Sequence, residues 1–347
     1  MNVAIIRHSI RNRGGDKLIL DYCGYLIAQG WKITYWTNEV KTKFTIPVGV
    51  QIRPIPFPGI AGTMFFALIR KFESPVVLVD LVIMASLISF RNQGRVVYLA
   101  QDYDVKYHRF PVLRWLEHAS YRKVLRNPAV LTVAVSQGLT RQLDSYNPLN
   151  ISTVPNGIDP EHFFPDLDEE FKKLKEGNLI VGLYARTDYR KGLDIAKEAV
   201  RILKSSQIRE SWQLWTIGES PLKLPNIRTK HFGFIDSEDR LRHFLSAVDV
   251  FLVPSRHEGF GLLTVQAMAC GCAIVSTEAL LILTHQQDAL LSPVGDAQSL
   301  AKNLEQVLRD QNLRKQLREG ARNTVRQYSL KNSCENFEKI LRELPTK

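Results

Sequence analysis

The sequence predicts an α/β protein built from two doubly wound, Rossmann-like domains of parallel strands. The chain has 347 residues, which suits two domains of about 150 residues each better than one core. Apolar strands alternate with helices in both halves, as expected for parallel sheets covered by helices. Turn residues cluster between the halves at 154–160 (VPNGIDP), where we expect the linker.

The first half begins with a strand, a glycine-containing loop and a helix. We expect a strand at 2–7 (NVAIIR), the loop at 11–15 (RNRGG), a helix at 16–29 and strands at 32–37, 97–101 and 131–136. The most apolar stretch, 76–90, contains Asp80 and is shorter than the roughly 20 residues that span a bilayer. It therefore predicts a buried strand that leads into a helix.

The second half repeats the alternation. We expect strands at 178–185 (NLIVGLYA), 212–218 (WQLWTIG), 250–255 (VFLVPS) and 273–276 (AIVS), and helices at 166–175, 193–203, 240–248 and 262–270. Parallel sheets of this kind bind ligands outside the carboxyl ends of their strands. The loops that follow these strands are therefore the places to search for a site.

The predicted domain boundary also separates two charge patterns. We place one domain at 1–155 and the other at 156–329, and expect a C-terminal helix at about 330–347 to pack back on the first domain. Residues 1–155 carry a net charge of +10, whereas the rest of the chain carries +1. This asymmetry predicts an anionic partner for the first domain.

The four cysteines predict neither a disulfide framework nor a zinc site. Cys270 and Cys272 are two residues apart at a helix end, a spacing that suits neither. The apolar run after Met1 is too short for a secretory signal. We therefore expect reduced, buried thiols in a cytoplasmic protein.

The loop HEGFG (257–261) follows a predicted strand and leads directly into a predicted helix. Its glycines let the backbone approach a ligand closely, and the free N–H groups at Gly261, Leu262 and Leu263 would form an anion site. Glu258 is better placed to accept hydrogen bonds from hydroxyls, which favours a sugar phosphate or sugar nucleotide. On spacing alone, a plain glycine turn with a solvated Glu258 is equally open.

A second loop, ARTDYRKG (185–192), supplies positive charge at another strand end. Arg186 and Lys191 could neutralise a departing diphosphate without a metal. Taken alone, a solvated basic loop is the simpler interpretation. One loop that donates amides and another that donates charge together favour a nucleotide-diphosphate site.

These motifs resemble those of the retaining glycosyltransferases with the GT-B fold, the large family of glycosyl transferases group 1 that includes bacterial glycogen synthase and lipopolysaccharide and mannosyl transferases. The matching stretches are VAVSQGLTRQL, VPNGIDPEHF, ARTDYRKG and HFGFIDSEDRLRHFLSAVDVFLVPSRHEGFGLLTVQAMACGCAIVS, with RNRGG as the amino-terminal glycine loop. The resemblance implies two Rossmann-like domains facing across a cleft, the first binding the acceptor and the second the nucleotide sugar.

The resemblance also implies roles for individual residues. Arg186 and Lys191 would hold the donor diphosphate and Glu258 would contact hydroxyls of the transferred sugar, so these three are the expected catalytic residues. The other expected donor-binding residues are Gly15, Phe234, Ile235, Phe260, Gly261, Leu262, Leu263 and Gln266. In the family, Gly15 would approach the phosphate, residues 234–235 would lie near the nucleobase, and residues 260–262 would offer backbone amides.

Three departures from the family pattern matter. Gln266 stands where the family usually has a second glutamate that binds the ribose hydroxyls, and an amide lacks the charge-assisted strength of a carboxylate. The usual Gly-Gly turn is missing after Thr277. Where many members carry a histidine that faces the reacting sugar, this chain offers Gln101 and Asp102 as acceptor-side candidates, and His108 is a weaker substitute.

The triplet Asp102-Tyr103-Asp104 has the form of the metal motif of a different glycosyltransferase fold. Three-residue matches are common by chance, and the rest of that fold is absent. We therefore expect no metal and no cofactor, with Arg186, Lys191 and helix amides in place of a divalent cation.

Residues 105–126 contain six Lys/Arg against one acid, interleaved with aromatic residues and leucines. The favoured interpretation is an ordinary helix with a solvated basic face. The alternative is peripheral contact with anionic lipid at the inner face of the membrane, which would bring the enzyme to a lipid-linked acceptor. No recognition motif supports nucleic acid as a partner.

The resemblance thus implies a metal-independent retaining hexosyltransferase. It would move a hexose from a nucleotide-diphosphate sugar to a hydroxyl of a growing polysaccharide or glycolipid. We expect UDP as the nucleotide, with UDP-glucose ahead of GDP-mannose. Two alternatives stay open: a sugar-nucleotide-binding pseudoenzyme, which Gln266 and the missing histidine would suit, and a GT-B-fold sugar-nucleotide epimerase, whose acid/base carboxylates are not evident.

Overall fold

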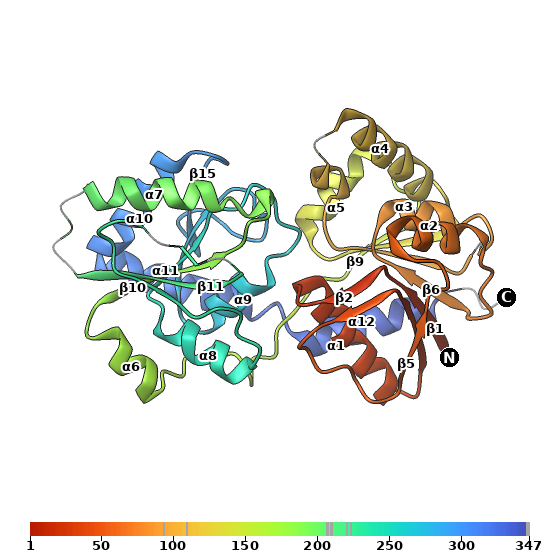
Figure 1. Cartoon of the computed structure of the whole chain (residues 1–347), viewed down its shortest axis with the longest axis horizontal. Coiled ribbons are helices and arrows are strands. Elements are labelled where there is room, and N and C mark those ends of the chain that lie inside the picture. Colours follow the sequence, from red (N-terminus) through yellow and green to blue (C-terminus); the bar gives the residue numbers. More distant parts are fainter. Residues whose placement is uncertain are drawn as a thin grey trace. The chain divides into compact units, whose positions relative to one another are not determined.

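The computed structural model describes residues 1–92, 94–108, 110–205, 208, 211–219, 221–222 and 224–344. The chain forms two compact units (Figure 1). Unit 1 comprises Met1–Asn156 with Leu330–Lys347, and unit 2 comprises Gly157–Ser329. The domain boundary expected between residues 155 and 156 lies one residue before this division.

Unit 1 is built on a parallel sheet of seven strands in the order β5-β3-β1-β6-β7-β8-β9. Its strands are β1 (Asn2–Ile6), β3 (Lys32–Thr37), β5 (Val50–Pro54), β6 (Val76–Val79), β7 (Val96–Ala100), β8 (Val130–Ala134) and β9 (Ile151–Thr153). The central strands β6, β7 and β8 are buried at every residue. This explains their continuous apolar sequences, because helices cover both faces of a parallel sheet.

The helices of unit 1 lie on both sides of this sheet (Figure 1). They are α1 (Gly14–Ala28), α2 (Gly59–Ile69), α3 (Val82–Ile88), α4 (Pro111–Leu125), α5 (Gln137–Leu143) and α12 (Leu330–Arg342), with 3-10 turns η1 (Asp104–Tyr107) and η2 (Asp144–Tyr146). A separate parallel pair joins β2 (Ser9–Arg11) to β4 (Glu39–Lys41).

The C-terminal helix α12 packs against α1, so the end of the chain belongs to unit 1. The Tyr22 ring stacks on Phe337 with 4.2 Å between centroids, and its hydroxyl lies 2.9 Å from Ser333 Oγ. Trp31 Nε1 donates to Glu338 Oε1 at 2.9 Å. Both polar contacts are buried, which ties the helix to one register on α1.

Unit 2 has a six-stranded parallel sheet in the order β12-β11-β10-β13-β14-β15. Its strands are β10 (Leu179–Ala185), β11 (Trp212–Gly218), β12 (Thr229–His231), β13 (Val250–Val253), β14 (Ala273–Thr277) and β15 (Ala289–Ser292). Its helices are α6 (Glu169–Lys175), α7 (Leu193–Ser205), α8 (Glu238–Ala247), α9 (Leu262–Ala269), α10 (Ala297–Arg309) and α11 (Gln311–Val325), with the 3-10 turn η3 (Tyr189–Lys191). Helices α7 and α10 lie on one side of the sheet and α6 and α8 on the other (Figure 1).

The prediction of an α/β protein with two doubly wound Rossmann-like domains is confirmed. Two helix starts differ from the expected ones because capping side chains decide them. Asp168 accepts a hydrogen bond from Phe171 N, so α6 begins at Glu169 rather than 166, and Ser237 caps α8, which begins at Glu238 rather than 240.

Several elements of unit 1 were not anticipated from the sequence. Strand β5 is an edge strand with exposed residues and a terminal proline, so it lacks the alternation of a half-buried strand. Helix α2 (GIAGTMFFALI) is apolar around most of its circumference and shows no helical period. Local sequence patterns of this kind do not distinguish a strand from a helix or a loop.

The four cysteines are free and buried, as expected. Burial raises the pKa of the thiols of Cys23, Cys270 and Cys334 to about 12. Among the described residues, no helix is both long and apolar enough to cross a membrane.

Phe337→Ala should lower the free energy of unfolding of unit 1 by about 3–5 kcal/mol, because it removes a fully buried ring that stacks on Tyr22. Urea unfolding followed by circular dichroism measures the loss. Lys331→Ala on the same helix is the control, since Lys331 is exposed and should change stability by less than about 0.5 kcal/mol. Equal stability of the two variants would show that α12 does not pack on unit 1.

Candidate functional site

The strands β10 and β13 are parallel neighbours in the sheet of unit 2. Their register pairs Val181 with Val250 and Leu183 with Leu252. Their carboxyl ends therefore meet at one edge, and the loop that begins at Arg186 emerges beside the loop that contains Glu258. The two loops singled out from the sequence are brought together by this pairing.

Lys191 and Glu258 form an ion pair between these loops. Lys191 Nζ lies 2.8 Å from Oε1 and 2.9 Å from Oε2 of Glu258. The Ser255 hydroxyl donates to the same Oε1 at 2.7 Å. The side chains of Lys191 and Glu258 are only 20% and 12% exposed. This excludes the interpretation of Glu258 as a solvated side chain of a plain turn.

Close backbone contacts hold the two loops in register. Gly192 has φ +63°, and a Cβ there would lie 2.0 Å from the Pro254 carbonyl oxygen, so only glycine fits. Arg256 N donates to Arg190 O at 2.6 Å. The second loop therefore lies directly against the first along its backbone.

The Arg256 side chain also connects the two loops. Its guanidinium donates to both carboxylate oxygens of Asp194 at 2.8 and 2.6 Å and lies 4.0 Å from the centroid of the Tyr189 ring. These hydrogen bonds from Arg256 hold the pKa of Asp194 below its usual value. Sequence reasoning missed Ser255 and Arg256, although both flank the HEGFG motif and carry side chains that suit a carboxylate.

The first turn of α9 presents unpaired backbone amides. Gly261 precedes the helix with φ +79°, and its carbonyl accepts from Thr264 N and Val265 N. Within the described residues, the N–H groups of Leu262 and Leu263 have no acceptor. They lie at the half-buried start of the helix, the geometry in which helix amides bind an anion.

Two predicted donor-site residues near α9 are more enclosed than expected. The Phe260 ring is buried edge-on against Tyr328, with 5.2 Å between centroids, so only its backbone could meet a ligand. Gln266 is 9% exposed, and its carboxamide makes no hydrogen bond to any residue that the structure describes. In the loop after Thr277, the buried Leu280 packs on Gly261, where a Cβ would lie 2.5 Å from Leu280 Cδ1.

Arg186 is a mostly buried cation at the end of β10. Its Nε has no hydrogen-bond acceptor among the described residues, and Glu219 Oε1 lies 3.6 Å away. The guanidinium carbon is 5.9 Å from the centroid of the Tyr184 ring. A buried guanidinium nitrogen without an acceptor favours an anionic ligand at this position.

The stretch that contains Phe234 and Ile235 joins this edge of the sheet through β11. Gly218 ends β11 and donates its N–H to Gly233 O at 2.8 Å. The side chains of Phe234 and Ile235 are half-buried. Gly218 was not anticipated as part of the site; its φ of +115° and the 2.6 Å from its would-be Cβ to Ala185 O require glycine.

The predicted residues of unit 1 are Gly15, in the first turn of α1, and Gln101 and Asp102, which directly follow β7. The Gln101 carboxamide donates to Gly15 O at 3.3 Å and to Asp80 Oδ2 at 3.4 Å. The Arg7 guanidinium forms ion pairs with both Asp16 and Asp80. A Cβ on Gly15 would lie 2.2 Å from Gln101 Oε1, so Gly15 and Gln101 depend on one another.

The Asp102 carboxylate is engaged by neighbouring residues of unit 1. It is buried and accepts from Tyr103 N at 2.9 Å and from the Tyr107 hydroxyl at 3.2 Å. Asp104 is also buried and accepts from Val82 N at 2.7 Å, and burial raises its pKa well above the usual value. The strand end therefore turns both carboxylates inward, and Asp102 as an acceptor-side group stays a prediction.

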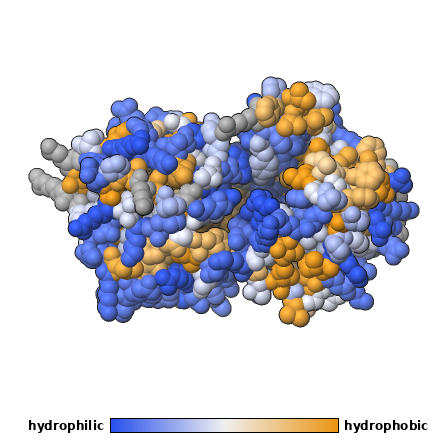
Figure 2. All heavy atoms as spheres, in the orientation of Figure 1, coloured by the Kyte–Doolittle hydropathy of each residue, from blue (hydrophilic) through white to orange (hydrophobic). Residues whose placement is uncertain are grey.

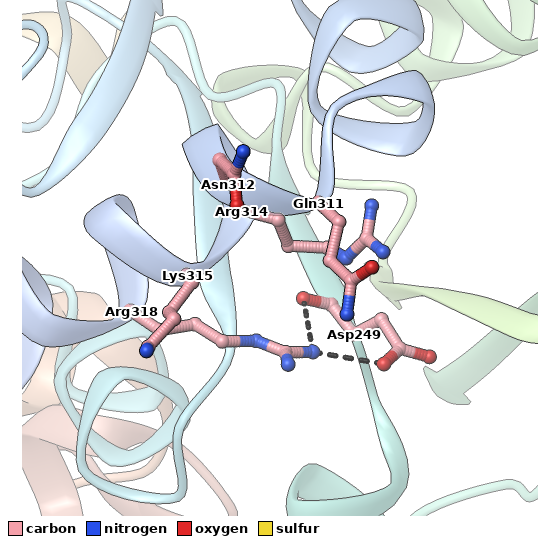
Figure 3. A pocket seen from close by; sticks show the side chains of 6 residues that line it. All are labelled: Asp249, Gln311, Asn312, Arg314, Lys315 and Arg318. Atoms are coloured by element: carbon pink, nitrogen blue, oxygen red, sulfur yellow. Dashed lines mark hydrogen bonds and ion pairs between the residues drawn. The ribbon is translucent and has the colours of Figure 1, made fainter.

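A separate hollow of about 570 Å³ lies at the amino-terminal edge of the sheet of unit 2, lined by Asp249, Gln311, Asn312, Arg314, Lys315 and Arg318 (Figure 3). Asp249 directly precedes β13, whereas Glu258 follows it. Its carboxylate is already bound by Lys175 at 2.6 Å and by Arg318 at 2.8 Å, and it accepts from Ile180 N. These contacts give Asp249 a structural role that joins α6, β10 and α11.

The fold and the paired loops define a Rossmann-like protein with a candidate anion site at the carboxyl edge of its second sheet. Residues 166–324, a little under half of the chain, match the model of the family described as "Glycosyl transferases group 1". Over 208 residues the chain is 29% identical to the D-inositol 3-phosphate glycosyltransferase of Jonesia denitrificans. The match covers 53% of this chain and 49% of that protein, so the chain spans about half the length of this relative.

Solved structures extend the likeness to both units. The sucrose-phosphate synthase of Thermosynechococcus elongatus superposes with a TM-score of 0.80 at 18% identity, over 99% of each chain. HepE of Anabaena, solved in complex with UDP and glucose, superposes with a TM-score of 0.77 at 17% identity, over 99% of this chain and 100% of that one. At these identities the likeness concerns the fold, which is that of the GT-B glycosyltransferases.

Gly192→Ala should destabilise unit 2 by about 2–4 kcal/mol, because the new Cβ would collide with Pro254 O at a left-handed backbone position. Gly177→Ala is a matched control, since Gly177 also has positive φ but nothing within 4 Å of its would-be Cβ. It should lose about 1 kcal/mol. Thermal unfolding of both variants measures the difference, and equal losses would contradict the close approach of the two loops.

Proposed function

We propose that this chain is a retaining, metal-independent glycosyltransferase that moves a hexose from a nucleotide-diphosphate sugar to a hydroxyl acceptor. The observation that carries the proposal is the Lys191–Glu258 ion pair beside the unpaired amides of Leu262 and Leu263. This arrangement offers a carboxylate for sugar hydroxyls next to positive charge for a diphosphate. The match of residues 166–324 to the model of the group 1 glycosyl transferases supports it.

The donor diphosphate would be held by side chains and backbone together. Arg186, with its buried unpaired Nε, and Lys191 would bind the diphosphate oxygens, and the first-turn amides of α9 would bind a further oxygen. Ser255 keeps Glu258 oriented when Lys191 turns toward phosphate. Glu258 would then accept hydrogen bonds from hydroxyls of the hexose.

The chemical step forms one bond and breaks another at the anomeric carbon of the donor hexose. The acceptor oxygen forms the new glycosidic bond on the face from which the diphosphate leaves, and the bond between the anomeric carbon and the diphosphate oxygen breaks. The acceptor proton passes to the departing diphosphate. Arg186 and Lys191 stabilise the charge that develops on that oxygen, which replaces the role of a divalent cation.

We infer UDP as the nucleotide and glucose ahead of other hexoses, supported by the likeness in fold to HepE, which was solved with UDP and glucose. The acceptor would be a glycan or a lipid-linked glycan. The relative from Jonesia denitrificans is named D-inositol 3-phosphate glycosyltransferase, which favours a phosphorylated polyol as a further candidate acceptor. No nucleic acid enters the proposed reaction.

A ligand screen followed by a transfer assay tests this function. UDP should raise the thermal unfolding temperature more than GDP or ADP, and mass spectrometry of donors with acceptor extracts should then reveal a glycosylated product. If none of the three nucleotides stabilises the protein, the proposed donor site is wrong. Binding of UDP without turnover of any donor would indicate a pseudoenzyme, and conversion of a donor without an acceptor would indicate an epimerase.

Arg186→Ala combined with Lys191→Ala should lower kcat/KM for transfer by about 100-fold or more, because two groups that stabilise the leaving diphosphate are removed. Arg201→Ala, an exposed cation on α7, is the control and should retain full activity. Initial rates over a range of donor concentrations measure both. Wild-type kcat/KM in a folded double variant would rule out this role for the loop.

Gln266→Glu should tighten UDP binding by about fivefold, because a carboxylate accepts stronger hydrogen bonds from ribose hydroxyls than an amide does. Isothermal titration calorimetry measures the change. Gln306→Glu on α10 adds the same charge at an exposed position of unit 2 and should leave affinity unchanged. Unchanged or weaker binding by Gln266→Glu would show that residue 266 does not meet the ribose.

A further inference from the structure

The amino-terminal half of α4 exposes large apolar side chains. Five of the seven residues from Phe110 to Leu116 are large and apolar, and all of them are exposed. Phe110 is 70%, Val112 69% and Trp115 63% exposed. An ordinary surface helix with a basic face would turn such residues toward the core. An ordinary helix with a solvated basic face, which is the interpretation favoured from the sequence, therefore does not account for residues 110–116.

The carboxyl-terminal half of α4 anchors the helix in unit 1. Tyr121, Val124 and Leu125 are buried. The Tyr121 hydroxyl accepts from Asp104 N at 2.9 Å and lies 3.2 Å from the Tyr98 hydroxyl. The exposed apolar half is therefore the projecting end of a fixed helix.

The stretch of chain that contains this helix end is rich in exposed positive charge. From residue 59 to residue 126 the described cations that are exposed are Arg70, Lys71, Arg91, Lys106, Arg114, Arg122, Lys123 and Arg126. Glu73 is the one exposed carboxylate in the same described stretch, because the other four acids are buried. Glu117, the acid within α4, is turned inward toward His108 at 3.1 Å. The surface therefore combines apolar side chains with nearly unopposed positive charge.

Further apolar surface lies next to α4 in the same unit. Figure 2 shows hydrophobic atoms gathered over α4 and over α2, and α3 packs beside both helices (Figure 1). The exposed ring of Phe90, directly after α3, lies under Lys123, with Nζ 3.3 Å from the ring centroid. The exposed large apolar residues of α2 are Ile60, Phe65, Leu68 and Ile69.

We propose that residues 110–116, with the surrounding cations, bind the surface of an anionic lipid bilayer. Apolar side chains would enter the boundary between headgroups and acyl chains, while Lys106, Arg114 and Arg122 would meet anionic headgroups. Nucleic acid suits this segment less well, because Arg114 is the sole polar side chain among the seven residues. Lipid binding here uses no residue of the proposed donor site, so it stands or falls independently of the transferase activity.

Sedimentation with vesicles tests the surface in the full chain. The protein should pellet with vesicles of phosphatidylcholine mixed with an equal amount of phosphatidylglycerol, and much less with phosphatidylcholine alone. Binding should weaken as salt rises from about 0.1 M to about 1 M, which shortens the screening length from about 10 Å to about 3 Å. The combined variant Phe110→Ala, Val112→Ala, Trp115→Ala should bind at least about tenfold more weakly.

Two control measurements keep the test decisive. Leu149→Ala removes a side chain of unit 1 that is 65% exposed but lies outside α4, and it should bind vesicles like wild type. Because the replaced residues are exposed, the combined variant should keep the circular dichroism spectrum and unfolding temperature of the wild type. The replacement Arg114→Gln with Arg122→Gln should reduce binding to anionic vesicles and remove most of its salt dependence.

Trp115 also gives a direct optical readout. Of the five tryptophans it is the exposed one, so vesicle binding should shift its emission to shorter wavelength. Trp115→Phe should abolish the shift and still pellet with the vesicles. This outcome would place residue 115 at the bilayer rather than only near it.

Three results would overturn the proposal. The first is absence of binding to anionic vesicles, and the second is equal binding by the combined α4 variant. The third is a different partner for the same residues. Either the chain forms a dimer that the combined variant converts to monomer, or it binds nucleic acid more tightly than vesicles and the combined variant abolishes that binding.

Discussion

The parallel pairing of β10 with β13 is the constraint on which the geometry of the proposed donor site depends. Parallel neighbours end at the same edge of a sheet, so the loops after Ala185 and Val253 emerge side by side. Gly192 then lies against the Pro254 carbonyl, and this contact leaves Lys191 within reach of Glu258. The helix amides of α9 follow in the same loop. A side chain at residue 192 would push the two loops apart and so separate Lys191 from Glu258 and from the amides of α9.

The two cations of this edge are in different states. Lys191 Nζ binds both carboxylate oxygens of Glu258, whereas the buried Nε of Arg186 has no hydrogen-bond acceptor among the described residues and lies 3.6 Å from Glu219 Oε1. A buried ion pair contributes little net stability, because desolvation offsets much of the attraction. We propose that the ion pair holds Glu258 and Lys191 in place until a donor brings hydroxyls to Glu258 and phosphate oxygens to Lys191. Ser255 gives Glu258 a partner that remains in either state.

The two units divide the charge and the exposed apolar surface unequally. Residues 1–155 hold nearly all of the net positive charge, and residues 105–126 contribute to it with six Lys/Arg against one acid, Glu117, which is buried. Unit 2 instead pairs its cations with acids, as Lys191, Arg256 and Arg318 illustrate. Exposed cations without neighbouring acids, next to apolar side chains, favour binding to an anionic surface. Cations that are paired with acids instead hold side chains in fixed positions, as a ligand site requires.

Local sequence signals by themselves determined the two parallel sheets, most helices and the two loops of the donor site. Apolar strands, capping residues and glycine turns act over a few residues, so they are visible without the fold. The edge strand β5 and the uniformly apolar α2 lack such a period and were missed. Only the tertiary structure decided that Lys191 pairs with Glu258, 67 residues away, that Asp102 turns inward, and that Trp115 stays exposed. These outcomes depend on which distant segments pack together, and that information lies in the sheet order rather than in any short stretch of sequence.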